Sequence, residues 1–598
     1  MLTKPIEAEV TDELLDTADN NYHTPEWAKH VIWYQIFPER FRNGDSSNDP
    51  TGERVNGPEG WAPTPWTSDW YDRADWEKSM GDSFMDGVYH RRYGGDLQGV
   101  IDKLDYLMEL GIGALYLNPI FEAVSLHKYD ASCYRHIDRF FGPDPEGDRA
   151  IIEQEDPQNP ATWQWTSADK LFLKLIEEVH NRDMKIIIDG VFNHTGTDFW
   201  AFRDLAEKQD ESIFKDWYAV KSFNDPYVGS VFDYEGWWGH KSLPELKEEG
   251  DTLVKPVREH IFEITKRWMD PNGDGNPSDG VDGWRLDVPE EVGKGFWKEW
   301  NAVVRSINPE AYTVGELWTS DSKEWVSGEL FTAAMNYPFA KSVQRYIIDQ
   351  SISTNEFLDE LEEVRNSFPK DAPYVMQNLM DSHDTPRLAS MVVNPGREYN
   401  EDGRPKLGFD VRKPNAEERR IQKLVSLFQY TYVGAPMIYY GTEAGMWGAG
   451  DPDDRKPMVW PDFEYDPERL DPLDRERPVD DNNFDEKLFN WYKKLGEIRN
   501  EHEVLQTGNF VPLPSDEQEY FVFARQKSSL DFAIVVINRS EEPRQIKIPL
   551  ANFELPEHTY LENQLTDTGI EFSEHSAEIS LPPVSGAILI PEQKDQCD

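Results

Sequence analysis

The chain has 598 residues, of which 38% are hydrophobic and 13% aromatic, so it can bury a large core together with accessory domains. Lys and Arg number 61 against 113 Asp and Glu, which gives a formal net charge of −52. A field of that sign repels phosphate backbones and anionic membrane surfaces, and we therefore expect no nucleic acid partner.

The ends of the chain and its cysteines carry no targeting or redox signal. The first residues, MLTKPIEAEVTDELLD, lack a basic segment followed by an apolar run, and no stretch approaches the roughly 18 apolar residues of a membrane span. We expect no membrane insertion and a cytoplasmic location, or export if a presequence has been removed. Cys133 and Cys597 are too few for a disulfide framework or a cysteine-only zinc site.

From Val31 onward, apolar strand-like runs alternate with amphipathic helical stretches. The run VIWYQIF, for example, precedes a helical stripe of Ile101, Leu104, Leu107 and Leu110. The predicted strands cover residues 31–37, 113–120, 185–192, 281–288, 312–317, 331–337, 374–380 and 435–440. The predicted helices between them include residues 98–111, 171–180, 257–268, 296–304, 355–368 and 417–432. This pattern fits a closed parallel (β/α)8 barrel better than the alternative, an open doubly wound sheet.

Three segments depart from this alternation. Residues 43–93 follow the first strand and residues 196–250 follow the third. The segment 196–250 is long enough for a small inserted domain B. After Thr507 short strands replace the helical periods, at 519–526, 532–538, 544–550 and 586–590, which indicates a C-terminal antiparallel β-sandwich. We therefore expect an extension at 1–28, the barrel at 29–505, which includes 196–250, and the sandwich at 506–598.

The segment 43–93 is rich in tryptophan. Trp61, Trp66, Trp70 and Trp76 fall within it. They form either an aromatic wall for ligand stacking beside a cleft or the ordinary packing of a long loop against the barrel rim, and the sequence favours neither.

Charged side chains gather where the predicted strands end. In chain order they are Asp189 and His194 with the third strand, Arg285 and Asp287 with the fourth, Glu316 with the fifth, and His383 and Asp384 after the seventh. Any one of these would ordinarily be a capped or ion-paired group. Their convergence on the carboxyl ends of the strands, where barrels of this kind bind their ligands, indicates a common site.

Two of these carboxylates suit the cleavage of a glycosidic bond. That reaction needs one carboxylic acid to protonate the leaving oxygen and one carboxylate to attack or to activate water. Asp287 and Glu316, on neighbouring strands, fit the two roles. Arg285 lies two residues before Asp287 on the same face of the strand, so we expect its charge to lower the pKa of Asp287.

Four ordered motifs carry a resemblance to a known family. IIIDGVFNHT, GWRLDV, VGELW and MDSHDT resemble the four signature regions of the α-amylase family, glycoside hydrolase family 13, and GAPMIYYGTEAG resembles its eighth-strand region. The resemblance spans nearly the whole chain, from Pro25 onward. It implies a TIM barrel and a retaining α-glucan hydrolase that cleaves α-1,4 bonds in maltooligosaccharides, starch-like polymers or cyclodextrins.

The same resemblance implies roles for individual residues. Asp287 would be the nucleophile, Glu316 the general acid and base, and Asp384 the third carboxylate, which binds sugar hydroxyls and favours ring distortion. The expected substrate-binding residues are Tyr129, Asp189, His194, Arg285, Trp318, His383 and Arg387. Among them Tyr129 would stack beneath the sugar ring and Asp189 would support Arg285.

Further motifs point to one branch of the family. HKYDASCY, the Glu291 of DVPEEV, SHDTPR and DPDDRKPMVW resemble neopullulanases, cyclomaltodextrinases and maltogenic amylases. Members of that branch carry an N-terminal domain of about a hundred residues that helps form dimers, whereas here the barrel pattern begins near residue 30. KSLPELK stands where the branch often has MPKLN, and Pro289-Glu290 replaces Ala-Asn. These departures leave oligomeric state, endo or exo action and the choice among starch, pullulan and cyclodextrin open.

Two loops have the oxygen-rich composition of calcium sites, and no organic cofactor is expected. The first candidate, of the kind the branch carries, consists of Asn43, Asp45, Asn48, Asp49, Gly94 and Asp96. The second has Asp270, Asn272 and Asp274 at calcium-loop spacing, but Val281 stands where such a loop has Glu. The alternative for each is a turn stabilised by Asn and Asp side chains.

Three rival functions were weighed against hydrolysis. A transglycosylase would use the same intermediate with a sugar hydroxyl in place of water. A non-catalytic sugar-binding barrel would be expected to lack one of Asp287, Glu316 and Asp384. An oxidoreductase or aldolase ranks lowest, because the sequence has neither a Gly-rich phosphate loop nor an apolar-pocket lysine at a strand end.

Overall fold

The computed structural model describes residues 22–401, 408–514, 519–556, 559–573 and 575–593. Its centre is an eight-stranded parallel sheet in the order β10-β9-β8-β5-β2-β1-β12-β11. A parallel bridge between Met335 and Gln377 joins the two outer strands, so the sheet closes on itself. The strands are β1 (Trp33–Ile36), β2 (Ala114–Leu117), β5 (Lys185–Gly190), β8 (Gly283–Leu286), β9 (Tyr312–Gly315), β10 (Ala333–Ala334), β11 (Gln377–Leu379) and β12 (Ala435–Tyr439). Each lies within a predicted run, and the predicted (β/α)8 barrel is confirmed.

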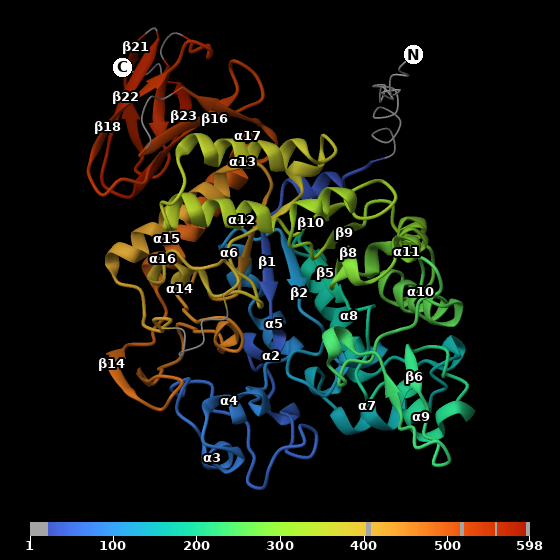
Figure 1. Ribbon diagram of the computed structural model, residues 1–598. Coiled ribbons are helices and arrows are strands. Elements are labelled where there is room, and N and C mark those ends of the chain that lie inside the picture. Colours follow the sequence, from blue (N-terminus) through green and yellow to red (C-terminus); the bar gives the residue numbers. More distant parts are fainter. Residues whose placement is uncertain (1–21, 402–407, 515–518, 557–558, 574, 594–598) are drawn as a thin grey trace, which may run out of the picture.

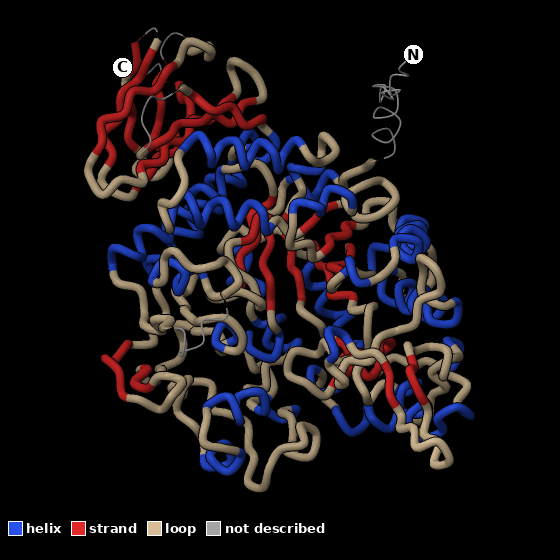
Figure 2. Tube along the Cα trace, viewed as in Figure 1, coloured by secondary structure: helices blue, strands red, loops and turns tan. Residues whose placement is uncertain are grey.

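The helices that follow the strands form the outer layer of the barrel (Figure 1, Figure 2). They are α5 (Leu97–Asp102), α6 (Leu104–Glu109), α8 (Ser167–His180), α10 (Lys255–Met269), α11 (Lys294–Ile307), α12 (Tyr337–Val343), α13 (Thr354–Asn366), α14 (Leu388–Val393), α15 (Ala416–Thr431), α16 (Glu486–Glu501) and α17 (Glu503–Thr507). Several begin at a capping residue: Thr166, Ser353 and Asn415 each accept a backbone N–H of the first turn. The single helix predicted over 98–111 is wrong, because the backbone leaves helical geometry at Lys103.

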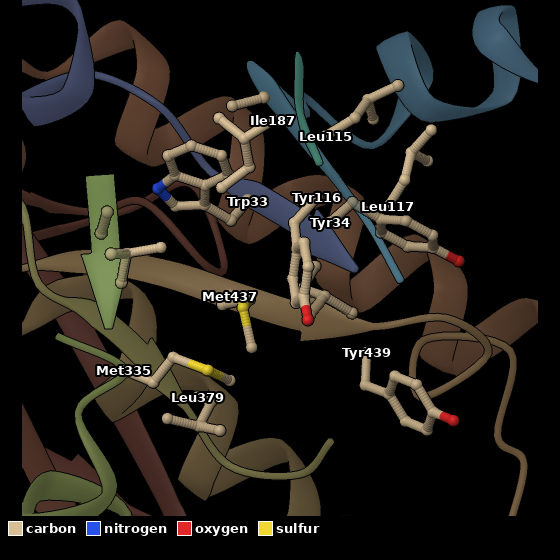
Figure 3. Close-up of a cluster of buried hydrophobic side chains, with 14 of the residues drawn as sticks. Trp33, Tyr34, Leu115, Tyr116, Leu117, Ile187, Met335, Leu379, Met437 and Tyr439 are labelled. Carbon is tan, nitrogen blue, oxygen red and sulfur yellow. The ribbon is translucent and has the colours of Figure 1, made fainter. Parts of the chain in front are cut away.

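The barrel interior is filled by alternate residues of the strands. Trp33, Tyr116, Ile187 and Met437 are fully buried and belong to one cluster, whose side chains Figure 3 shows. Because side chains alternate across a strand, the residue two positions beyond a core residue faces the same interior, nearer the carboxyl end. On β5, for example, Ile187 fills the core and Asp189 reaches the site.

The connections after the first three strands build structure around the mouth of the barrel. After β1 come α2 (Pro38–Phe41), α3 (Asp75–Met80) and α4 (Phe84–Gly87); after β2 come β3 (Phe121–Ala123), β4 (Ala131–Ile137) and α7 (Pro145–Ile152); after β5 come α9 (Trp200–Lys208), β6 (Val220–Ser222) and β7 (Asp233–Tyr234). A further hairpin, β13 (Glu468–Leu470) and β14 (Glu476–Asp480), follows β12. The β3–β4 hairpin was not predicted, since both strands lie between the predicted strand at 113–120 and the predicted helix at 171–180.

The tryptophans of segment 43–93 pack against their own segment and against the connection after β12. Trp70 and Trp76 are buried, and Trp70 donates to Asp453 Oδ1 at 2.8 Å. Trp61 and Trp66 donate to the backbone carbonyls of His90 and Met458, both at 2.9 Å. The residues that line the large cleft at the barrel mouth do not include these four, which favours the packing alternative over the sugar-stacking wall.

The C-terminal strands form two antiparallel sheets, as predicted. One has the order β15-β16-β17-β23-β19-β20 and the other β18-β22-β21. Their bounds are β15 (Asn509–Leu513), β16 (Tyr520–Gln526), β17 (Phe532–Asn538), β18 (Arg544–Pro549), β19 (Thr559–Asn563), β20 (Thr568–Ile570), β21 (Phe572–Ser573), β22 (Ser576–Leu581) and β23 (Ser585–Gln593). Side chains such as Val536 and Ile546 form a separate core between the sheets. We propose that 506–598 is a distinct domain and that 29–505, with 196–250 as domain B, is the catalytic one.

The larger C-terminal sheet also packs against the barrel. Phe521 of β16 contacts the rings of Phe357 in α13 and Phe428 in α15, with centroid separations of 5.8 and 5.9 Å. Both faces of β17 are therefore covered, which explains its unbroken apolar run. Among the described residues, no helix is long and apolar enough to cross a membrane.

Candidate active site

The charged residues predicted at the strand ends meet at the carboxyl end of the barrel. Asp189 on β5 is in register with Arg285 on β8, and Arg285 is in register with Val314 on β9, two residues before Glu316. Asp287 follows β8 directly and Glu316 follows β9 directly. Neighbouring parallel strands therefore deliver these groups to one place.

Arg285 is the hub of this cluster. It is fully buried, and its Nη1 lies 2.9 Å from Asp189 Oδ1 and 2.8 Å from Asp287 Oδ1. Its Nη2 lies 2.7 Å from Glu316 Oε2. Both carboxylates proposed for catalysis thus contact the same guanidinium, so they lie side by side on the floor of the site.

Further donors fix the carboxyl group of Glu316. Trp318 Nε1 donates to Oε1 at 2.9 Å, and the backbone N–H of Val288 donates to Oε2 at 3.1 Å. Trp318 is itself stacked on Tyr337 with a centroid separation of 3.8 Å. These contacts hold the side chain in one orientation without closing the cleft above it.

The pKa of Asp287 differs from the sequence prediction. Arg285 lowers it, as predicted, but burial raises it more, and the charges of Glu316 and Asp189 act in the same direction as burial. The pKa of Asp287 is therefore raised well above its ordinary value; the predicted lowering by Arg285 is present but does not decide the net direction. Burial likewise raises the pKa of Asp189 to about 6, against the opposing effect of Arg285.

Asp384 and the histidines surround the other side of the site. Asp384 Oδ1 lies 3.1 Å from Arg455 Nη2, and its Oδ2 lies 3.0 Å from His383 Nε2. His383 Nδ1 lies 2.9 Å from Gln35 Nε2, and its ring is parallel to that of Tyr129 at 5.5 Å. Burial, with the charges of Arg285 and Arg455, holds the pKa of His383 well below its usual range. The imidazole is therefore neutral near pH 7, with its orientation set by its neighbours.

These residues line one cleft of about 830 Å³, a size typical of ligand sites. The predicted residues that line it are Tyr129, His194, Asp287, Glu316, Trp318, His383 and Asp384. Asp189 and Arg285 lie beneath its floor, fully or almost fully buried, where they position the carboxylates. Burial lowers the pKa of His194 to about 4, so it too is neutral.

Arg387 was predicted to bind substrate, but it does not line the cleft. Its side chain is fully buried, its Nη1 donates to the backbone carbonyl of Tyr440 at 2.7 Å, and its guanidinium lies over the rings of Tyr439 and Tyr440 at 4.5 and 4.8 Å. The arginine therefore braces the eighth strand, and the predicted contact with substrate is wrong.

Sequence reasoning missed several residues of the cleft. They include His127, Trp237, Trp238, Lys341 and Arg455. None lies at the end of a barrel strand, so the rule that located the carboxylates could not find them. Two stood inside quoted motifs, HKYD and DPDDRKPMVW, and the adjacent tryptophans of domain B were the other available signal.

Comparison with known proteins agrees with this geometry. The model of the α-amylase catalytic domain matches residues 35–155 and 167–508. The chain belongs to the α-amylase family.

Relatives of the family support the same assignment. Neopullulanase 2 of Thermoactinomyces vulgaris is 34% identical over 573 residues, which cover 95% of this chain and 79% of that protein. A cyclomaltodextrinase of Geobacillus thermopakistaniensis is 32% identical and covers 94% of this chain and 77% of its own length. Among solved structures, the cyclic α-maltosyl-(1→6)-maltose hydrolase of Arthrobacter globiformis has a TM-score of 0.68 at 25% identity and covers 95% of this chain and 100% of its own. This α-amylase family protein is a glycoside hydrolase.

The first predicted calcium loop gathers oxygen atoms around a buried amide. Asn48 is almost fully buried, its Nδ2 donates to Asp96 Oδ2 at 3.2 Å, and its Oδ1 has no hydrogen-bond partner among the residues that the structure describes. Asn43 donates to Asp49 Oδ1 at 2.7 Å, and a Cβ on Gly94 would lie 2.2 Å from that oxygen. Burial, together with the charge of Asp96, raises the pKa of Asp49 to about 6. An unpartnered oxygen beside two crowded carboxylates fits a hard cation.

Asp45 and the second loop serve turns. Asp45 Oδ1 accepts from the N–H of Ser47 at 3.0 Å. In the second loop, Asp270, Asn272 and Asp274 accept backbone N–H groups of their own loop, at 3.0, 2.8 and 2.7 Å. Within the described ranges, no group of three or more His, Cys, Asp or Glu is placed to hold a metal ion. Asp270 Oδ1, however, is buried and has no hydrogen-bond partner among the described residues, so the turn contacts account for only part of the second loop.

The electrostatics of the cluster predict opposite shifts in two variants. Arg285→Gln removes the positive charge that lowers the pKa of Asp287, and the pKa of Asp287 should therefore rise. Asp189→Asn removes a negative charge that raises the pKa of Asp287, and the pKa of Asp287 should therefore fall. A reaction that needs Asp287 in its ionised form is lost below this pKa. The acid limb of kcat/KM against pH should therefore move to higher pH in Arg285→Gln and to lower pH in Asp189→Asn. Shifts of the same sign in both variants would contradict this account.

Proposed function

We propose that the protein is a retaining α-glucan hydrolase that cleaves α-1,4-glucosidic bonds in maltooligosaccharides, starch-like polymers or cyclodextrins through a covalent glycosyl-aspartate intermediate. One observation carries the proposal: the buried guanidinium of Arg285 lies 2.8 Å from Asp287 and 2.7 Å from Glu316 at the floor of the cleft. Retaining enzymes use two such carboxyl groups about 5–5.5 Å apart. The printed names of the relatives, a neopullulanase and cyclomaltodextrinases, support the substrate class.

In the first chemical step, Asp287 attacks the anomeric carbon while Glu316 donates its proton to the leaving oxygen. The glycosidic bond breaks, the leaving sugar departs with that proton, and an ester forms on Asp287. Glu316, now ionised, takes a proton from water as the water attacks the same carbon and releases Asp287. Contact with Arg285 stabilises the negative charge on Asp287 that the first step needs.

The remaining groups hold the sugar at the cleavage point. Tyr129 offers its ring face, while His194 and His383 are neutral and can exchange hydrogen bonds with hydroxyls. Asp384 is paired with Arg455 and His383 and is 29% exposed at its side chain, so it retains capacity to accept from sugar hydroxyls. We assign it to substrate binding and ring distortion.

Transglycosylation is the second candidate, because it shares every step up to the covalent intermediate. The cleft is open to solvent, and the similar solved structure from Arthrobacter globiformis is named a hydrolase, which favours water as the acceptor. Chromatography of the products formed at high maltotriose separates the two outcomes, since transfer yields chains longer than the substrate.

Replacing the nucleophile tests the mechanism. Asp287→Ala should lower kcat for maltoheptaose on the order of 10⁴-fold, because no covalent intermediate can form. The matched control is Asp210→Ala, an exposed carboxylate of domain B, which should leave kcat unchanged. Melting temperatures would show that both variants fold.

The stereochemistry of the first product completes that test. Proton NMR at early times should show the α-anomer released by the wild-type enzyme, as two successive displacements require. A β-anomer, or near wild-type turnover by the Asp287 variant, would reject the assignment.

We also propose that calcium binds the first loop and stabilises the fold, with Asn43, Asn48, Asp49, Gly94 and Asp96 as ligands. Adding about 1 mM CaCl₂ to chelator-treated protein should raise the melting temperature by about 2–5 °C, because the ion binds only the folded state. Asn48→Ala should abolish this response, whereas Asn272→Ala in the second loop should not. A calcium response unchanged by Asn48→Ala would place the ion elsewhere.

A further inference from the structure

Trp238 of domain B is exposed at the rim of the active-site cleft. Its side chain lines the cleft, yet 75% of the residue's surface is accessible to solvent. The neighbouring Trp237 also lines the cleft and packs against one face of Trp238, with ring centroids 5.1 Å apart and planes 18° apart. The opposite face of Trp238 is therefore the open one.

This exposed indole is held in place and is not a frayed loop residue. Its backbone has φ 49° and ψ 28°, a left-handed conformation that is uncommon for a bulky side chain and persists only where the surroundings enforce it. Trp238 Nε1 donates to Glu291 Oε1 at 3.2 Å. Trp237 in turn stacks on His194 at 5.6 Å. The indole is thus fixed both to the cleft floor and to the loop after β8.

The contact with Glu291 shows on which side of the scissile bond the platform lies. Glu291 is the last residue of the short turn Pro289–Glu291, and Val288 is the residue directly before that turn. The N–H of Val288 donates to Glu316 Oε2, so the turn begins against the proposed general acid. The acid protonates the leaving oxygen and hence faces the leaving sugar. His383, Asp384 and Tyr129 lie around the other sugar.

We propose that Trp238, fixed by Glu291, is a specificity-determining residue that stacks a glucosyl ring on the leaving-group side of the cleft. The inference rests on the proposed function and deepens it. The open indole face matches the apolar face of a pyranose, and the carboxylate beside it accepts hydrogen bonds from the ring's hydroxyls. Such a platform favours substrates that extend beyond the cleaved bond by at least one sugar.

Two substrates separate this role from a general one. Maltohexaose places sugars on both sides of the cleaved bond, whereas α-maltosyl fluoride releases fluoride and places no sugar on the leaving-group side. Trp238→Ala should lower kcat/KM for maltohexaose about 10-fold and leave that for α-maltosyl fluoride unchanged. Trp238→Phe should restore most of the loss, because a phenyl ring still stacks.

The controls address folding and location. Trp238→Gly should behave like Trp238→Ala and accepts the positive φ without strain, so it remains informative if the alanine variant folds poorly. Tyr227→Ala removes an aromatic residue that is 97% exposed in the same inserted segment but does not line the cleft, and it should leave both substrates unaffected.

Two outcomes would overturn the inference: equal losses on both substrates, or no loss on maltohexaose in any Trp238 variant. Wild-type protein inactive on both substrates would instead reject the proposed function itself, together with this extension of it. The two failures are therefore distinguishable.

Discussion

The site depends on one buried cation that carries three carboxylates. Arg285 is fully buried and pairs with Asp189, Asp287 and Glu316, so three acidic side chains share one positive charge. Removing a partner from a buried pair leaves an uncompensated charge, which costs several kcal/mol. The raised pKa values of Asp189 and Asp287 express this crowding. The fold withstands such crowding because parallel strands fix the backbone on either side of each charge.

Much of the fold could be predicted because two patterns dominate the sequence: continuous apolar runs in the barrel strands and a helical repeat of apolar residues between them. All eight barrel strands fall within predicted runs, since a strand buried on both faces reads as a continuous apolar segment. Arg285 and Asp287 stand out as charged residues inside one such apolar run. Two features that follow neither pattern were not predicted. The β3–β4 hairpin depends on tertiary contacts, and the break at Lys103 depends on local backbone geometry.

The electrostatic error has a physical cause that a sequence cannot contain. Arg285 lies two residues from Asp287, so its lowering effect on the pKa was visible in the spacing. The opposing effect of burial, and the charge of Glu316 across the sheet, depend on how closely three strands approach one another. The prediction that Arg387 binds substrate failed for a related reason. A motif placed the residue near the site but did not give the direction of its side chain, which points to the backbone of Tyr440.

The tryptophans show why specificity is harder to predict than chemistry. Trp61, Trp66, Trp70 and Trp238 all direct their indole N–H groups to acceptors within the protein, but among these four only Trp238 lines the active-site cleft. Composition cannot distinguish these cases, because burial of an aromatic ring and its exposure to a sugar require the same residue. The chemical groups sit on or directly after barrel strands, whose geometry is constrained by the closed sheet. The surface that we propose to select the substrate lies in the connection after β5, so it can change without disturbing the carboxylates beneath it.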